Sequence, residues 1–308
     1  TVTGAFTDSG VRDTHTAIID WGDGARSPGL FSFSGGSGSV SASHTYAQSG
    51  IYVVTLLLSD DDAGAASQTT QTLVSGVAVH TGVLQVVGTA SDDHVTINPV
   101  GQHFYRIHAS FFEESFRDFP AEGIERIVVM LCGGDDFAHI AGSIDVPVIL
   151  DGGDGNDQLK GGGGHDILLG GDGDDMLEGG GNGERDLLIG GQGTDLLIGN
   201  AGDDILIAGR TAFDSDKQAL ARIMAEWTSS RSYEARTDNL RGNGSGPRLN
   251  GEIFLDGSSA DATVFDDGDE DKLTGGSGSD WFFANLSGGV RDRLFDRQGS
   301  ELVDELGS

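Results

Sequence analysis

The sequence predicts a mostly β protein: an antiparallel β-sandwich, then a solenoid of stacked short strands, then a C-terminal capping segment with one or two helices. Three observations support this. Residues 1–76 contain short β-branched and aromatic segments separated by turn clusters. Residues 152–207 contain six contiguous copies of a glycine-rich repeat. Residues 214–241 change to the spacing of an amphipathic helix.

These patterns divide the chain into four parts. We expect a sandwich over 1–76 and a strand-rich connector that begins the stack over 77–132. The repeats and one upstream degenerate copy form the solenoid over 133–209. Residues 210–308 form the helix-containing cap, which carries further degenerate repeats.

The charge and composition exclude several classes of protein. Asp and Glu number 49 against 18 Lys and Arg, for a net charge of −31, which argues against nucleic acid as a partner. A single cysteine, Cys132, rules out a disulfide framework. No apolar run approaches the ~20 residues of a membrane span. An acidic protein of this kind requires a counter-ion.

In the first part, we expect strands at Thr16–Asp20, Gly29–Phe33 and Ile51–Leu58. The last has apolar residues on both alternating faces, which predicts a strand buried on both sides. Two motifs here, HTAIIDWGDG and HTYAQSGIYVVTLLLSDDDAG, resemble the PKD domain, an immunoglobulin-like module of secreted and surface proteins. The resemblance covers about 70 residues and implies an immunoglobulin-like sandwich.

The PKD resemblance also implies a second candidate metal site, because some such domains bind calcium in acidic loops. Asp8, Asp13 and Asp60 are the candidate ligands. The alternative is a loop that only aids solubility. We expect Trp21 to anchor the sandwich rather than to bind a ligand.

Each repeat combines three glycines, an aspartate at the sixth position and a short apolar strand. Glycine permits backbone conformations closed to other residues, so the chain can wrap tightly. A leucine in each strand is expected to face inward, and stacked repeats then bury a continuous core. These leucines are Leu159, Leu168, Leu177, Leu188, Leu197 and Leu206.

The repeats resemble the glycine-rich nonapeptide of RTX proteins, the calcium-binding β-roll. That resemblance implies two repeats in each coil, so that repeat n lies over repeat n+2. It brings together Asp157 with Asp175, Asp166 with Asp186, Asp175 with Asp195, and Asp186 with Asp204. The predicted ligands are these carboxylates and the main-chain carbonyls of the first glycines, Gly152, Gly161, Gly170, Gly179 and Gly190.

Stacked carboxylates oppose folding unless a cation lies between them. Two carboxylates ~4 Å apart repel by roughly 4 kcal/mol at an effective dielectric near 20. Ca²⁺ accepts six to eight oxygen ligands in flexible geometry, whereas Mg²⁺ holds its waters and Zn²⁺ needs Cys or His. We therefore expect calcium, with binding and folding inseparable.

Two flanking copies extend this prediction. Asp136 lies in the upstream copy, and Asp271 and Asp280 lie in the downstream copy at 267–283. At these three positions a simple turn-forming role is the alternative. The six good repeats predict four ions, and the flanks raise the number to about eight.

Helical spacing places Leu220, Ile223, Met224 and Trp227 on one face. Ser215 and Gln218 suggest a capping box at the start of this helix, and a second helix is expected over Tyr233–Leu240. We expect the Trp227 face to dock on the end of the roll, and a strand to follow at Gly251–Leu255.

We find no catalytic motif and expect no enzyme activity, since the carboxylates are better explained as calcium ligands. The sequence instead predicts a secreted or cell-surface calcium-binding protein that folds on extracellular calcium. Adhesion, surface-layer building or filament assembly are the expected uses. The expected partners are calcium ions, copies of the chain itself and cell-surface or matrix components.

Two other functions stay open. The chain starts at Thr1 without Met, so we expect a fragment or processed product, and it could be the secretion and folding tail of an enzyme whose catalytic domain lies upstream. The second of these functions is polysaccharide binding by the sandwich. The RTX resemblance implies a bacterial protein that leaves the cell by type I secretion.

Overall fold

The computed structural model describes residues 1–7, 14–61, 64–258, 260–299 and 301–307. The chain divides into two compact units, Thr1–Ala78 and Val79–Ser308. Asp8 and Asp13 lie outside the described residues.

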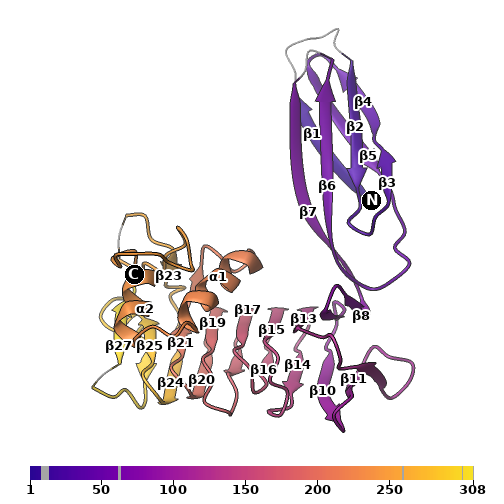
Figure 1. Cartoon of the computed structure of the whole chain (residues 1–308). Helices are drawn as coiled ribbons and strands as arrows, with labels where there is room; N and C mark the ends of the chain where they lie inside the picture. Colours follow the sequence, from indigo (N-terminus) through magenta and orange to yellow (C-terminus); the bar gives the residue numbers. More distant parts are fainter. Residues whose placement is uncertain (8–13, 62–63, 259, 300, 308) are drawn as a thin grey trace. The chain divides into compact units, whose positions relative to one another are not determined.

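The first unit consists of two small antiparallel sheets, with the strand orders β1-β5-β4 and β3-β2-β6-β7 (Figure 1). Its strands are β1 (Val2–Thr7), β2 (His15–Asp20), β3 (Arg26–Pro28), β4 (Leu30–Ser34), β5 (Ser37–Ala42), β6 (Gly50–Asp60) and β7 (Ala65–Val74). The sheets share one apolar core that contains Ile19, Val40 and Val54. Trp21 belongs to this core and is 3% exposed, which confirms its predicted anchoring role.

The prediction that Ile51–Leu58 is buried on both faces is wrong. Tyr52 and Val54 point into the core, whereas Val53 is 53% exposed and Leu57 is 40% exposed. The other sheet covers only one face of β6, so the alternate side chains remain on the surface.

The second unit is built from two nine-stranded sheets that the chain visits in alternation. Sheet one has the order β27-β25-β21-β19-β17-β15-β13-β9-β8, and sheet two has the order β12-β11-β10-β14-β16-β18-β20-β24-β26. The strands are β8 (Gly76–His80), β9 (Val83–Val87), β10 (His94–Val100), β11 (Phe104–Ala109), β12 (Arg117–Pro120), β13 (Arg126–Gly133), β14 (Phe137–Ile140), β15 (Val148–Asp154), β16 (Gln158–Lys160), β17 (Ile167–Asp172), β18 (Met176–Glu178), β19 (Leu187–Gln192), β20 (Leu196–Ala201), β21 (Ile205–Ile207), β24 (Lys272–Ser277), β25 (Trp281–Ala284), β26 (Arg293–Leu294) and β27 (Leu302–Glu305).

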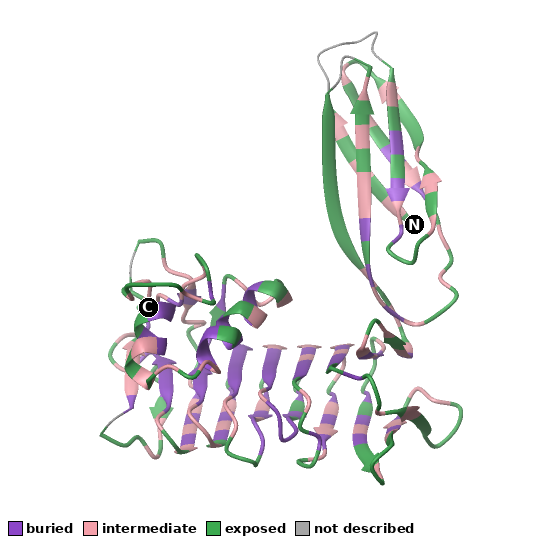
Figure 2. Ribbon diagram, in the orientation of Figure 1, coloured by how far each residue is buried: buried purple, intermediate pink, exposed green. Residues whose placement is uncertain are grey.

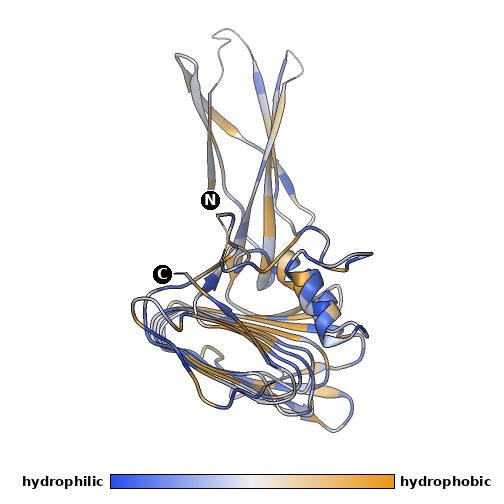
Figure 3. Cartoon of the chain, turned by 90° about the vertical axis from the view of Figure 1, so that its left-hand side faces the viewer, coloured by the Kyte–Doolittle hydropathy of each residue, from blue (hydrophilic) through white to orange (hydrophobic). Residues whose placement is uncertain are grey.

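The repeats stack as parallel coils, with two repeats in each coil. Leu159 pairs with Leu177 in sheet two, and Leu168 pairs with Leu188 in sheet one, so repeat n lies over repeat n+2 as predicted. All six inward leucines are at most 1% exposed. Figure 2 shows the strands of sheet one mostly buried and those of sheet two banded with intermediate and exposed residues. Figure 3 looks along the stack, so that successive coils superimpose as a flattened loop.

An insert of two helices interrupts the stack between β21 and β24. A two-stranded stem, β22 (Arg210–Thr211) with β23 (Val264–Phe265), closes its base. The helices are α1 (Lys217–Trp227) and α2 (Tyr233–Leu240), and the predicted apolar face of α1 is buried. The N-cap is Asp216 rather than Ser215, because the Asp216 carboxylate accepts hydrogen bonds from the backbone N–H groups of Gln218 and Ala219.

Two further expectations for this region are wrong. The helices lie over sheet one, along the flank of the roll rather than at its end (Figures 1 and 3). Gly251–Leu255 is not a strand. The Asn250 side chain donates to the carbonyl of Ile253 at 2.6 Å, which closes a local turn in place of strand pairing.

Candidate metal centre

Buried aspartates form two columns, one along each edge of the roll. Those of the first column lie where sheet one leads into sheet two, and those of the second lie where sheet two leads back. The first column contains Asp93, Asp136, Asp157, Asp175, Asp195, Asp271 and Asp292. The second contains Asp166, Asp186, Asp204 and Asp280. Every member is at most 6% exposed.

Backbone hydrogen bonds tie each column together. The N–H of each aspartate donates to Oδ1 of the aspartate one coil further on, at 2.6–3.0 Å in the first column. The second column repeats the pattern from Asp166 to Asp280 at 2.8–2.9 Å. The four aspartate pairs that the RTX resemblance implied are therefore neighbours, although each carboxylate meets its neighbour's amide through Oδ1.

The second carboxylate oxygen is the unusual feature of these columns. Among the described residues, seven Oδ2 atoms are buried and have no hydrogen-bond partner. They belong to Asp136, Asp157, Asp175, Asp195 and Asp271 in the first column and to Asp204 and Asp280 in the second. A buried acceptor without a partner costs about 1–3 kcal/mol, and more when it is charged, so these oxygens need a cation or a proton.

Protein donors instead satisfy both ends of the first column and one end of the second. Asp93 accepts from the Thr89 N–H at 2.6 Å and from the Ser110 hydroxyl at 2.8 Å. At the other end of the first column, Oδ2 of Asp292 accepts from the Asn285 N–H at 2.7 Å. In the second column, Oδ2 of Asp166 accepts from the Gly162 N–H at 2.6 Å.

Burial also raises the pKa values of aspartates in both columns. It raises the pKa of Asp157 from its ordinary 3.8 to about 7, with further repulsion from Asp136. It raises the pKa of Asp195 to about 8 and that of Asp271 to about 9. The pKa of Asp204 also lies well above its usual range, again mainly because of burial. Without a cation, the columns therefore favour protonated carboxyls near neutral pH.

Main-chain oxygens gather beside these carboxylates. A methyl group placed on Gly152 would lie 2.0 Å from Oδ2 of Asp157 and 2.7 Å from the carbonyl oxygen of Gly170. The same convergence occurs at Gly170, where Oδ2 of Asp175 and the carbonyl of Gly190 lie 2.2 and 2.3 Å away. The carbonyls of Gly170 and Gly190, two of the predicted ligands, thus lie near the Oδ2 atoms of Asp157 and Asp175, which have no partner among the described residues. The predicted carbonyl of Gly179 instead lies near Asp166, whose Oδ2 already accepts the Gly162 N–H.

The role we assigned to the first glycines needs correction. Gly152 and Gly170 do not have positive φ, so their backbone conformation is open to other residues. They are required because oxygen atoms fill the space that a side chain would occupy. Positive φ occurs at the second and fourth positions, as at Gly171 (121°) and Gly173 (133°).

Sequence reasoning missed Asp93 and Asp292 as column members. Both follow the repeat pattern loosely, because an apolar residue lies two positions after each aspartate, Val95 and Leu294 respectively. That spacing is the signal that could have identified them. Asp60 is described at the end of β6, but its proposed partners Asp8 and Asp13 are not, so no second centre can be built from them.

Within the described ranges, no three His, Cys, Asp or Glu side chains gather into a group that could hold a metal. Any ion in the columns must therefore take backbone oxygens in addition to carboxylates. Hard oxygen donors alone, in a flexible turn, are the set that Ca²⁺ prefers.

Comparison with known families agrees with this geometry. Residues 151–182, 180–211 and 256–286 match the RTX calcium-binding nonapeptide repeat. RTX nonapeptide repeats bind Ca²⁺. The unmatched residues 212–255, between the RTX segments, include both helices. The comparisons with curated proteins and with solved structures found no match.

The carboxylate oxygens without partners among the described residues lie mostly within the segments that match the RTX repeat, and one lies outside them. Asp157, Asp175, Asp195, Asp204, Asp271 and Asp280 lie in matched segments, whereas Asp136 lies upstream of them. No helix in the described part of the chain is long and apolar enough to span a bilayer.

Proposed function

We propose that this chain is a secreted or cell-surface calcium-binding structural protein whose roll folds when it binds extracellular calcium. The seven buried Oδ2 atoms without partners among the described residues carry this proposal. They occur at the repeat turns, and at Asp93, Asp166 and Asp292 protein N–H groups occupy the corresponding Oδ2 atoms.

Asp157 and Asp175, with the carbonyls of Gly170 and Gly190, and Asp195, with the carbonyl of Ala208, would hold ions along the first column. Asp204 and Asp280 would do so in the second. The bound ions supply positive charge that keeps these carboxylates ionised inside the stack. The chain's own contribution is to align the oxygens through the N–H to Oδ1 bonds and to exclude water by burial.

The energetics support coupling of binding to folding. Raising the pKa of a carboxyl such as Asp157 from 3.8 to about 7 corresponds to about 4 kcal/mol against the ionised form. Several such groups together approach or exceed the whole stability of a typical domain, roughly 5–15 kcal/mol. We therefore expect the calcium-free roll to be unfolded at neutral pH.

This behaviour suits a protein that works outside the cell. RTX repeats are typical of secreted proteins. Extracellular calcium modules bind at roughly 10⁻⁴–10⁻³ M, so the roll would stay open where calcium is scarce and fold where it is abundant. A net charge of −31 adds repulsion that keeps the calcium-free chain extended.

We further propose that the first unit is a PKD-like module that serves as a spacer or contact surface. Its two antiparallel sheets and buried Trp21 support this. Adhesion, surface-layer or filament assembly, with copies of itself or with surface and matrix components, is the use we favour. The chain contributes structure rather than catalysis, and type I secretion is the proposed export route.

A calcium titration followed by circular dichroism tests the proposal. We expect a coil-to-strand transition in the Val79–Ser308 unit as calcium is added, with reversal by a chelator. A roll that is already folded in excess chelator at pH 7 would contradict it.

A further inference from the structure

Sheet one presents two apolar rows on its outer face. Each strand of a repeat points its central leucine inward, so the flanking residues point outward. The first row runs through Ile149, Ile167, Leu187, Ile205 and Trp281. The second runs through Leu169, Ile189, Ile207 and Phe283. All of these side chains are at most 5% exposed, so the face is covered.

An aspartate brackets each end of the second row. Asp151 pairs in register with Leu169, and Asp304 pairs with Phe283. Each binds a cation from one end of the helical insert. Nζ of Lys217, the first residue of α1, lies 2.5 Å from Oδ2 of Asp151, and Nε of Arg241, the C-cap of α2, donates to Oδ2 of Asp304 at 2.8 Å. The insert is thus attached at both ends of the apolar row.

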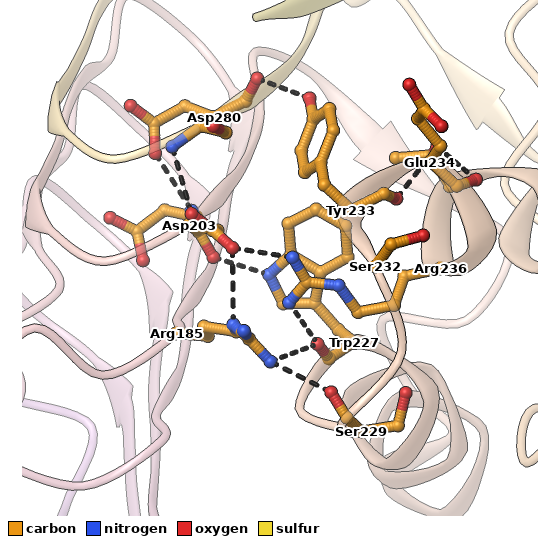
Figure 4. Close-up of polar contacts among 12 residues, drawn as sticks. Arg185, Asp203, Trp227, Ser229, Ser232, Tyr233, Glu234, Arg236 and Asp280 are labelled. Carbon is orange, nitrogen blue, oxygen red and sulfur yellow. Dashed lines mark hydrogen bonds and ion pairs between the residues drawn. The ribbon is translucent and has the colours of Figure 1, made fainter.

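A third attachment reaches the second aspartate column at Asp203, which directly precedes Asp204 (Figure 4). Arg236 on α2 is 1% exposed and donates to Oδ2 of Asp203 at 2.5 Å. The indole N–H of Trp227 donates to the Asp203 carbonyl at 2.7 Å. Oδ1 of the same Asp203 accepts the Ser279 N–H at 3.0 Å, which ties the two turns of the column together.

The fourth attachment is made by Tyr233, at the start of α2 (Figure 4). Its hydroxyl donates to the carbonyl of Asp280 at 2.7 Å and accepts the N–H of Leu302 at 3.2 Å. Asp204 and Asp280, whose turns are held in this way, are the members of the second column with partnerless Oδ2 atoms among the described residues.

We propose that the insert Lys217–Arg241 is a lid on sheet one whose closure is coupled to calcium in the second column. Arg236 and Tyr233 are positioning residues: they hold the turns of Asp204 and Asp280 without touching the candidate ligand oxygens. Coupling is reciprocal, so calcium at these turns must strengthen closure by the same factor by which closure strengthens calcium binding. This inference rests on the proposed function.

Open and closed states would differ in their exposed surface. With the lid open, the apolar rows from Ile167 to Trp281 would face water. Calcium in the second column therefore hides an apolar face as well as completing the stack. In the part of the chain that the structure describes, the lid has no attachment of this kind to the column turns of Asp157 and Asp175, so calcium binding there should not depend on it.

Two variants of the full chain test the lid. Y233F removes one hydroxyl and keeps the ring, and R236Q removes the buried guanidinium. R222Q, an exposed position on α1, is the matched control. Calcium binding is measured by calorimetry, and opening of residues 217–240 is measured by amide hydrogen exchange at saturating and at limiting calcium.

We expect Y233F to weaken a subset of the calcium sites by roughly fivefold, as for one lost hydrogen bond, and to speed exchange in both helices. R236Q should have a larger effect in the same direction, and R222Q none. Unchanged calcium affinity in Y233F and R236Q, or equal helix protection with and without calcium, would overturn the lid. If calcium gave neither heat nor folding in the unmodified chain, the proposed function itself would fail.

Discussion

The backbone N–H of Asp175 donates a 2.8 Å hydrogen bond to Oδ1 of Asp195, one coil further along the first column. Oδ2 of Asp195 is buried and has no partner in the part of the chain that the structure describes. One oxygen of this carboxylate thus fixes the spacing of the coils, while the other remains available to a cation. The same two roles recur at the other six aspartates whose Oδ2 has no partner among the described residues, and they lead to the following predictions.

Replacing Asp195 with asparagine should separate the two roles. The amide oxygen of the new side chain can still accept the Asp175 N–H, but the side chain carries no charge to bury. In chelator at pH 5, where we expect the calcium-free roll to be folded, D195N should gain roughly 1–3 kcal/mol in free energy of unfolding, because the cost of the buried carboxyl group is removed. In calcium, it should bind fewer ions. Urea unfolding and calorimetric stoichiometry measure these effects.

The matched control for this substitution is D174N. Asp174 is an exposed neighbour whose Oδ1 accepts the Thr194 N–H, an interaction that asparagine retains. D174N should change neither the free energy of unfolding in chelator nor the number of calcium ions bound. A D195N roll that is less stable than the unmodified roll in chelator would contradict the burial argument.

Acid should stabilise the roll without calcium and destabilise it with calcium. Folded-state pKa values are raised from 3.8 to about 6 for Asp136, about 7 for Asp175 and about 9 for Asp271, chiefly by burial. A carboxyl whose folded-state pKa is raised favours the folded state most when it is protonated in both states, which holds below pH 3.8. This contribution to the free energy of unfolding is lost as the pH rises through the folded-state pKa. In chelator, the roll should therefore fold near pH 4–5 and unfold between about pH 6 and 9.

With calcium present the sign reverses, because protons compete with the cation for the same carboxylates. Thermal unfolding at a series of pH values, with calcium and with chelator, measures both curves. Parallel curves with and without calcium would show that the column carboxylates do not bind the ion.

Gly152→Ala should be severely destabilising even in calcium. Its methyl group would lie 2.0 Å from Oδ2 of Asp157 and 2.7 Å from the Gly170 carbonyl. We expect a loss of about 3 kcal/mol or more in the free energy of unfolding, together with weaker calcium binding. Gly142→Ala is the control, because among the described residues no atom beyond its chain neighbours lies within 4 Å of its added methyl group, and its φ is not positive. Equal melting temperatures for the two variants would exclude the crowding that we describe at Gly152.

Ser110→Ala should affect stability without changing the number of ions. The Ser110 hydroxyl satisfies Oδ1 of Asp93 at the end of the first column, where a protein donor replaces a cation. We expect a loss of about 1–2 kcal/mol in the free energy of unfolding, since a buried carboxylate loses one donor. Calorimetry should give the same calcium stoichiometry as for the unmodified chain. A lower count would mean that Asp93 takes part in an ion site.

Local patterns in the sequence predicted much of the roll. The nine-residue period, the sixth-position aspartates and the inward leucines depend on neighbouring residues, and the structure places Leu159 and Leu168 as expected. The two helices were predicted for the same reason, with α2 at Tyr233–Leu240 in both cases.

The repeats also carried an unused signal for the lid. In the first two repeats the outward residues differ: Ile167 and Leu169 in sheet one are apolar, whereas Gln158 and Lys160 in sheet two are polar. The contrast is weaker later in the stack, where Leu196 and Ile198 in sheet two are apolar. That contrast indicates which face of the roll is covered. The sequence did not predict that the helical insert covers the outer face of sheet one. The lid attaches through single side chains such as Arg236 and Tyr233, and these residues do not recur at a regular spacing in the sequence.

From the sequence alone came the repeat, its acidic turns, the prediction of bound calcium and the identity of most strands and helices, because each depends on composition and spacing over a few residues. Only the tertiary structure decided which carboxylate oxygens lack a partner and which are capped. Those outcomes depend on groups distant in the chain, such as Asp204 and Asp280, which are 76 residues apart and separated by the insert. Burial and hydrogen bonding across that distance arise only when the coils stack.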